Sequence, residues 1–324
     1  MKDCFGRNID YLRISLTDRC NLRCKYCMPE CGVDLMRHED ILSLEEIVRI
    51  VDIMNAMGVT KVRLTGGEPM VRKNVVKLVE DLHSFSTIEY IAMTTNGLLF
   101  EPKVEELVNA GLTAVNISLD TLDEERFRAI TGMYGMEIVF RALQKSCMLG
   151  LRTKINCVPV RELNDADLED LAGFAKKLPV DVRFIELMPI GCGKEYEGIP
   201  SDEILDRLAR KYGPYEAFAG KRGNGPAKYV EFSGFLGKIG LISPMSHAFC
   251  GECNRIRLTA DGWLKLCLHY DIGVDLKTLL RDGSSDTVIK EVILEALEHK
   301  PQAHHFAAPT GTHEDVRKMV QIGG

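Results

Sequence analysis

Short apolar segments alternate with amphipathic helix patterns through the first two thirds of the chain, and this alternation constrains the fold most. The apolar segments are rich in Val and Ile, as strands buried on both faces of a parallel sheet are. They span residues 10–16, 61–64, 89–93, 114–119, 153–158 and 182–187. Ser43, with Glu46 three residues later, is a capping-box signal that starts the first of the intervening helices. Six successive strand–helix units predict an α/β fold with a parallel, partly closed (β/α)6 TIM-like barrel.

The alternation stops near Lys211. Glycines and prolines between residues 213 and 226 predict a loop or linker. Short strand-like segments follow, then helices at 276–280 and 287–299, and then a loose tail. We therefore expect a large first domain over residues 1–222 and a smaller C-terminal domain over residues 223–324 that closes the barrel.

Composition excludes several classes of protein. Of 324 residues, 45% are apolar and 27% charged, as in ordinary globular proteins. No apolar run is long enough to span a bilayer and no secretory signal is present, so we expect a cytoplasmic protein without a membrane partner. A net charge of −6 argues against nucleic-acid binding. Eleven cysteines in such a chain favour metal or iron–sulfur ligation over disulfides.

Cys20, Cys24 and Cys27 form a C-x3-C-x2-C pattern directly after the first predicted strand. Three thiolates can bind three irons of one cubane, which leaves the fourth iron open to a small molecule. The alternatives are a zinc site completed by Cys31 or His38, a Cys-x-x-Cys redox pair, or chance.

A second trio, Cys250, Cys253 and Cys267, lies in the C-terminal region and again suggests a cluster with one open iron. From spacing alone, a zinc ribbon completed by His247 or His269 remains open. Arg255 and Arg257 follow this trio's first pair and share one face of a predicted strand, where they could meet an anionic ligand. The alternative is an ordinary solvated strand face.

Several motifs directly follow predicted strands. Residues 66–69 (Gly-Gly-Glu-Pro) follow the second, 94–97 (Thr-Thr-Asn-Gly) the third, 118–120 (Ser-Leu-Asp) the fourth and 188–189 (Met-Pro) the sixth. Sites in parallel βα barrels assemble at the carboxyl ends of the strands. The sequence therefore predicts one site at this rim.

The first cysteine pattern, with Tyr26 before its last cysteine, and residues 65–69 resemble the radical S-adenosylmethionine superfamily. The second trio and the terminal Gly323–Gly324 narrow the resemblance to the GTP 3′,8-cyclase family of molybdenum cofactor biosynthesis. Further matches over nearly the whole chain are residues 5–7, 12–15, 61–65 and 184–189.

This resemblance implies a radical S-adenosylmethionine core and a lyase that converts GTP to (8S)-3′,8-cyclo-7,8-dihydroguanosine 5′-triphosphate. Its cofactors would be two [4Fe–4S] clusters and S-adenosylmethionine. An electron from the first cluster would release a 5′-deoxyadenosyl radical, which removes hydrogen from ribose C3′ before C3′ bonds to guanine C8. The second cluster would hold the purine through its open iron.

The resemblance also assigns residues. The implied S-adenosylmethionine contacts are Tyr26, Gly67, Ser118 and Met188. The implied GTP contacts are Arg13, Arg63, Thr94, Lys154, Arg183, Arg255, Ile256 and Arg257. Arginines suit a triphosphate, whereas Lys154 lies early in its predicted strand, away from the rim. The implied catalytic residues are Arg13, Arg63, Gly323 and Gly324, although a terminal diglycine is in most proteins a frayed end.

The implied partners are GTP, an unidentified electron donor and the next enzyme of the molybdopterin pathway, and the chain would be a monomer or homodimer. Two other functions remain open. A two-cluster radical enzyme that modifies a peptide or protein usually carries more cysteines beyond the barrel, where this chain has three after residue 192. A metal-binding or electron-transfer module would not need the Gly66–Pro69 motif.

Overall fold

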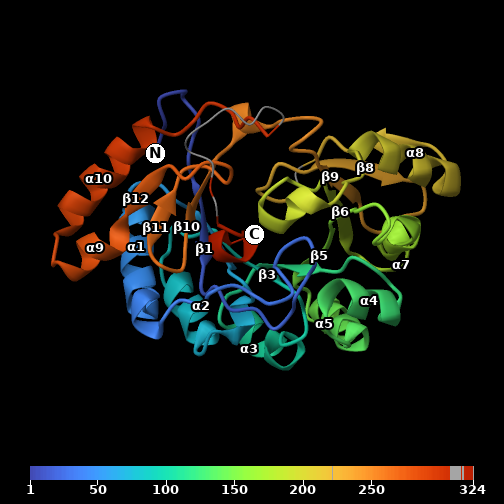
Figure 1. Ribbon diagram of the computed structural model, residues 1–324, viewed down its shortest axis with the longest axis horizontal. Helices are drawn as coiled ribbons and strands as arrows, with labels where there is room; N and C mark the ends of the chain where they lie inside the picture. Colours follow the sequence, from blue (N-terminus) through green and yellow to red (C-terminus); the bar gives the residue numbers. More distant parts are fainter. Residues whose placement is uncertain (221, 307–314, 316, 324) are drawn as a thin grey trace.

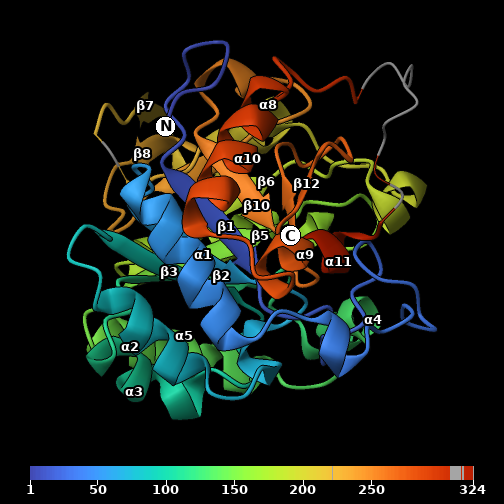
Figure 2. The ribbon, with the colours of Figure 1, turned by 90° about the vertical axis from the view of Figure 1, so that its left-hand side faces the viewer.

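The computed structural model describes residues 1–220, 222–306, 315 and 317–323. Their strands form a single curved sheet in the order β12-β11-β10-β1-β2-β3-β4-β5-β6-β9-β8-β7 (Figures 1 and 2). The six predicted strands are confirmed and pair parallel in chain order. They are β1 (Tyr11–Ser15), β2 (Lys61–Thr65), β3 (Tyr90–Thr95), β4 (Ala114–Ser118), β5 (Arg152–Cys157) and β6 (Asp181–Ile185).

Helices cover the outer face of these strands (Figure 1). They are α1 (Leu44–Ala56), α2 (Val75–His83), α3 (Val104–Asn109), α4 (Glu124–Thr131), α5 (Met136–Met148), α6 (Leu168–Ala172) and α7 (Phe174–Lys177). The capping box of α1 is confirmed, because Glu46 N donates to Ser43 Oγ at 3.1 Å and Ser43 N donates to Glu46 Oε2 at 2.7 Å. The last two of these helices, α6 and α7, are short and meet at Gly173.

The C-terminal region supplies strands to both edges of the barrel. β10 (Arg255–Leu258) pairs parallel with β1, and β9 (Ile239–Ile242) pairs parallel with β6. The remaining elements are α8 (Ser201–Tyr212), β7 (Tyr215–Ala217), β8 (Lys228–Phe232), β11 (Trp263–Lys265), β12 (Gly273–Asp275), α9 (Leu276–Arg281), α10 (Asp286–Glu298) and α11 (Met319–Ile322). One sheet thus runs through both expected domains, and the boundary at residue 222 stays a prediction.

The expectation of a loose tail is wrong for residues 317–323, whereas residues 307–314, 316 and 324 of that tail lie outside the described residues. α11 lies inside the barrel, where Val320 is 2% exposed and Ile322 is 1% exposed. A helix as short as α11 is not stable by itself. Burial of these apolar side chains therefore stabilises it.

The barrel has an apolar exterior and a polar interior. Leu12 and Ile14 of β1 belong to the hydrophobic core beneath the helices, whereas Tyr11 and Arg13 alternate to the other face. Tyr11 forms a small apolar cluster with Tyr90, Ala92 and Ala114, near the amino ends of β1, β3 and β4. Tyr11 and Tyr90 also line the cavity of the barrel interior, which extends from the carboxyl ends of the strands down to this level. Among the described residues, no helix combines the length and apolar character needed to cross a membrane.

Candidate active site

A cavity of about 1160 Å³ occupies the barrel interior and is lined by both cysteine trios. One drug-sized ligand needs roughly 300–1,000 Å³. The cavity therefore has room for more than one small molecule between the two trios.

The first trio, Cys20, Cys24 and Cys27, lies on the loop after β1. Main-chain hydrogen bonds hold this loop against the turn after β2, from Gly67 N to Thr17 O at 2.7 Å and from Glu68 N to Arg19 O at 2.8 Å. A Cβ on Gly66 would lie 2.7 Å from Thr17 O, and one on Gly67 would be closer still to Arg19 O. Both positions require glycine, because a side chain would push the cysteine loop away.

Burial dominates the electrostatics of the first trio. It raises the pKa of Cys27 to about 12 and the pKa of Cys24 well above the ordinary value, and neighbouring thiols add to both shifts. Burial also raises the pKa of Glu68 to about 7 and that of Asp120 to about 6. Thiolates gathered in such a place need a cationic group to stabilise them, which suits the iron of a cluster.

The four residues expected to contact S-adenosylmethionine all line the cavity: Tyr26, Gly67, Ser118 and Met188. The Tyr26 hydroxyl donates to Asp120 Oδ2 at 2.6 Å, and Asp120 Oδ1 accepts from Val158 N at 2.8 Å. Asp120 thus links the cysteine loop to the end of β5. The sequence placed Asp120 at the rim but gave no sign of this role, because its partners come from two other loops.

Arg257, Arg13 and Arg63 lie side by side on three adjacent parallel strands, β10, β1 and β2, in direct register. All three line the cavity. Burial, followed by Arg257 and Arg63, lowers the pKa of Arg13, and burial with Arg255 lowers the pKa of Arg257 to about 10. Crowded buried guanidinium groups favour an anion beside them. We call this set the arginine row.

Arg63 of the arginine row and Arg183 on β6 are buried cations whose hydrogen-bond partners are neutral. Arg63 is 5% exposed and donates from Nε to the Tyr11 hydroxyl at 2.6 Å and from Nη1 to Thr94 Oγ1 at 3.1 Å. Arg183 is 7% exposed and donates from Nε to Asn156 Oδ1 at 2.9 Å. Neutral partners leave their positive charge uncompensated for a polyanionic ligand.

Lys154 also lines the cavity, which answers the doubt about its place in the strand. It is 2% exposed, its Nζ donates to the Tyr229 hydroxyl at 2.8 Å and lies 3.6 Å from Asp181 Oδ2. Burial, followed by Arg183, lowers the pKa of Lys154 to about 7. Tyr229 and the glycine-rich segment before it form a wall of the cavity, so this segment is more than the linker its composition suggested.

The second trio lies beside β10 and β11: Cys250 and Cys253 precede β10, and Cys267 follows β11. Positively charged groups lie close to this trio. Arg7 Nη1 donates to Cys250 O at 2.9 Å, and Lys300, 3% exposed, donates to Arg255 O at 3.0 Å. Burial raises the pKa of Cys250. Burial alone would also raise the pKa of Cys253, but Arg255 and Lys300 outweigh it and bring that pKa to about 7. Neither Arg7 nor Lys300 carried a sequence signal for this trio.

Successive side chains of β10 point to opposite faces of the sheet. Arg255 and Arg257 line the cavity as the two-residue periodicity predicts. The Ile256 side chain is 1% exposed and packs in the hydrophobic core, on the other face of the strand. Among the expected GTP contacts, Ile256 differs from its neighbours because its side chain faces the core, so only its main chain is left for a contact, which stays a prediction.

The end of the described chain meets the arginine row. Arg257 Nη1 donates to Gly323 O at 2.9 Å. Gly323 has φ +73°, and a Cβ there would lie 3.1 Å from Ser15 Cβ and 3.2 Å from Thr65 Cγ2, so glycine fits this narrow place. Gly324 lies outside the described residues. Within the described part of the chain, no group of three or more His, Cys, Asp or Glu side chains is arranged to hold a single metal ion.

Two family models match the chain. Residues 14–175 match the Radical SAM superfamily, and residues 180–306 match Molybdenum Cofactor Synthesis C. Among solved structures, Streptococcus suis SuiB bound to precursor peptide SuiA is similar with a TM-score of 0.61 and 14% identity, over 92% of this chain and 66% of that one. This likeness supports the predicted barrel fold and nothing finer.

Curated relatives match from end to end. A GTP 3′,8-cyclase of Clostridium perfringens strain SM101 is 45% identical over 324 residues, and one of Syntrophomonas wolfei is 48% identical over 330 residues. Both alignments cover 100% of this chain and 100% of the relative. The chain belongs to the GTP 3′,8-cyclase family of radical S-adenosylmethionine enzymes.

Proposed function

We propose that this chain converts GTP to (8S)-3′,8-cyclo-7,8-dihydroguanosine 5′-triphosphate, the first step of molybdenum cofactor biosynthesis. The observation that carries the proposal is the buried arginine row, which lies in one cavity with both cysteine trios. A triphosphate is the kind of ligand that several buried guanidinium groups with neutral partners would stabilise.

Cys20, Cys24 and Cys27 would hold one [4Fe–4S] cluster, and Cys250, Cys253 and Cys267 a second. When bound, the first cluster supplies the electron that cleaves S-adenosylmethionine, and the second supplies an open iron for the purine. Tyr26, Gly67, Ser118 and Met188 line the cavity where they would contact S-adenosylmethionine.

The protein's own residues would bind and orient the nucleotide. Arg63, Arg183 and Lys154 place buried positive charge on three separate strands of the cavity wall, which suits oxygens spread along a triphosphate. Arg255 and Arg257 lie on β10 and Arg13 on the neighbouring β1, and Arg257 donates to the Gly323 carbonyl. Thr94 hydrogen-bonds Arg63 and fixes the direction of its guanidinium group.

Water exclusion is the other task of the protein. Tyr11 and Tyr90, with ring centroids 6.3 Å apart, place aromatic surface on the cavity wall, and the buried α11 fills part of the interior. A dry cavity protects reactive carbon centres from side reactions. An external reductant and a product-accepting enzyme complete the proposed partners.

The test is anaerobic reconstitution, followed by incubation with S-adenosylmethionine, reductant and GTP that carries deuterium at C3′. We expect 5′-deoxyadenosine that contains one deuterium, together with a cyclised isomer of GTP, both measured by mass spectrometry. Unlabelled 5′-deoxyadenosine formed at the same rate without GTP would exclude this substrate.

A matched pair of variants tests the arginine row. Arg63→Gln removes a buried charge that faces the proposed triphosphate, and losses of about 2–5 kcal/mol, roughly 30-fold to several thousand-fold in kcat/KM for GTP, are typical of such a change. Arg49→Gln removes an exposed arginine paired with Asp286 at 2.8 Å and should change kcat/KM less than about twofold. Equal effects of the two variants would contradict the assignment.

A further inference from the structure

The last described residues cross from the C-terminal region into the barrel. α11 lies at the centre of the molecule in Figure 1, and its Met319 and Val320 line the cavity. Beyond α11, the Gly323 carbonyl meets Arg257 of the arginine row. Burial of Val320 and Ile322 helps to hold this short segment, and chain ends stay ordered only where such contacts tie them down.

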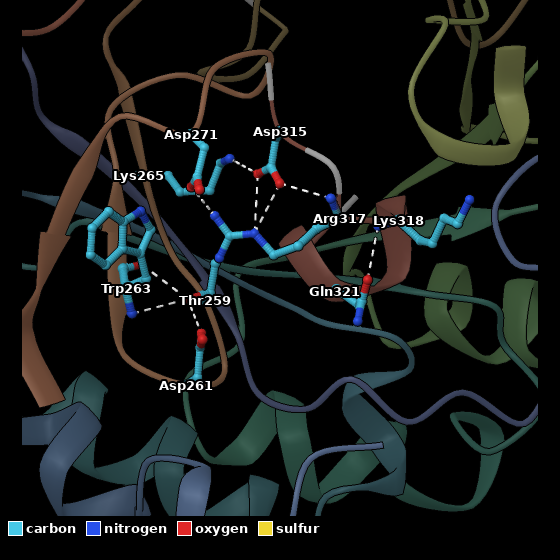
Figure 3. A network of polar contacts seen from close by, with 9 residues as sticks. All are labelled: Thr259, Asp261, Trp263, Lys265, Asp271, Asp315, Arg317, Lys318 and Gln321. Atoms are coloured by element: carbon cyan, nitrogen blue, oxygen red, sulfur yellow. Dashed lines mark hydrogen bonds and ion pairs between the residues drawn. The ribbon is translucent and has the colours of Figure 1, made fainter. Parts of the chain in front are cut away.

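A buried ion pair ties the chain end to the C-terminal region just before α11 (Figure 3). Asp315 pairs with Lys265 of β11, and their side chains are 2% and 0% exposed. Asp315 also accepts from Arg317 Nε at 3.0 Å and from Arg317 N at 2.9 Å. Its own backbone N–H donates to His269 O at 3.1 Å. Side chain and backbone of residue 315 are thus both held.

The charges of this network compensate one another. Burial by itself would raise the pKa of Asp315, but Arg317 and Lys265 outweigh it and lower that pKa, so the carboxyl is ionised at neutral pH. A buried carboxylate that loses its partners, or a buried lysine that loses its carboxylate, is costly to keep out of water. The tail therefore cannot leave this place without exposing or stranding charge.

A second contact guides the chain after the ion pair. A Cβ on Gly191, in the loop after β6, would lie 2.9 Å from Lys318 Cδ and 3.3 Å from Lys318 Cα. Lys318 N donates to Gln321 Oε1 at 2.9 Å, which caps the start of α11 (Figure 3). The chain end is thus held at Asp315, passes close to Gly191 and enters the cavity in a defined direction.

We propose that Asp315 is a positioning residue, which through Lys265 and Arg317 holds the C-terminal tail so that the Gly323 carbonyl meets Arg257. This inference deepens the proposed function and rests on it for the effect on turnover. The placement of the tail is a separate consequence that does not depend on the identity of the substrate.

The experiment compares Asp315→Asn with the full-length reconstituted enzyme. Hydrogen exchange of the peptide that covers residues 319–323, measured by mass spectrometry without GTP, should become at least about tenfold faster. Turnover of GTP should fall toward that of a chain that ends at Ile322, while iron content stays unchanged. Lys265→Met should reproduce both effects, and Lys265→Arg, which keeps the charge, should restore most of the protection.

Asp271→Asn is the matched control. Asp271 pairs with the outer side of the same Arg317, but its side chain is 45% exposed, so exchange and turnover should stay within about twofold of the unmodified enzyme. Native exchange at residues 319–323 in Asp315→Asn would overturn the proposal whatever the turnover. Equally faster exchange across β10, β11 and α10 would also overturn it, because Asp315 would then support the region as a whole. If exchange behaves as expected but GTP is not consumed by any variant, the proposed function fails and the anchor stands.

Discussion

The two cysteine trios share a ligand count and a cavity, but Cys24 and Cys27 of the first lie in electrostatic surroundings unlike those of Cys253 in the second. Around Cys24 and Cys27, burial and nearby acidic groups such as Asp120 disfavour negative charge. Around Cys253, Arg255 and Lys300 favour it strongly enough to bring the pKa to about 7. Nearby charges and hydrogen bonds tune both thiolate stability and cluster potential.

This difference suits two different tasks. A cluster in surroundings that disfavour negative charge is hard to reduce and so gives its electron readily once reduced. A cluster on the second trio would lie near Arg255 and Lys300, which favour the thiolate of Cys253 and would favour an anionic ligand on an open iron. We infer that the number of cysteines sets how many irons each trio could bind, whereas the neighbouring charges would set the reduction potential and the kind of ligand.

The largest effect is expected when one cysteine trio is removed at a time, because this should separate cleavage of S-adenosylmethionine from cyclisation of GTP. Replacement of Cys20, Cys24 and Cys27 by Ala should lower iron from about eight to about four per chain and abolish 5′-deoxyadenosine formation. The same change at Cys250, Cys253 and Cys267 should lower iron equally but leave some 5′-deoxyadenosine formation, without cyclised product. Iron assay and mass spectrometry decide this, and zinc in place of four irons in the unmodified enzyme would refute the second cluster.

Thiol alkylation in the metal-free protein should show the opposed surroundings directly. At pH 7 about half of Cys253 is thiolate, since its pKa is about 7, whereas Cys27, with a pKa of about 12, is almost wholly protonated. Even after the lower nucleophilicity of a low-pKa thiolate is allowed for, Cys253 should react about 10²–10³-fold faster with iodoacetamide. The advantage should shrink as the pH rises toward 12, and peptide mapping measures it. Equal rates at pH 7 would contradict the comparison.

The smallest effect is expected when one cation near each trio is removed, a buried lysine near the second and an exposed arginine near the first. Lys300→Met removes a buried ammonium beside the second trio, and the loss of such an outer-shell partner typically weakens metal affinity about 10–100-fold. Chelator titration should show this loss at the second cluster alone. The exposed Arg23, which donates to Cys20 O at 2.9 Å, is the control, and Arg23→Gln should change iron retention at the first trio less than about twofold. Similar losses in both variants would show that burial does not distinguish the two sites.

Much of the site followed from local sequence. The pairing of Ser43 with Glu46, the six strand segments and the shared face of Arg255 and Arg257 depend on neighbours within a few residues, so the pattern predicts them. Lys154 lies early in β5, as predicted, and it lines the cavity because the cavity reaches below the carboxyl ends of the strands. Ile256 was assigned by resemblance, and strand alternation places its side chain in the core.

The sequence by itself determined that the chain alternates strands and helices and carries two separate sets of three thiols, because periodicity and spacing are properties of adjacent residues. Only the tertiary structure decided that β10 pairs with β1, so that Arg257 joins Arg13 and Arg63 in one row. It also decided that Asp315 meets Lys265 and that the chain end is buried. These features depend on contacts between segments distant along the chain, where the gain from burying apolar surface and pairing charge outweighs local preference.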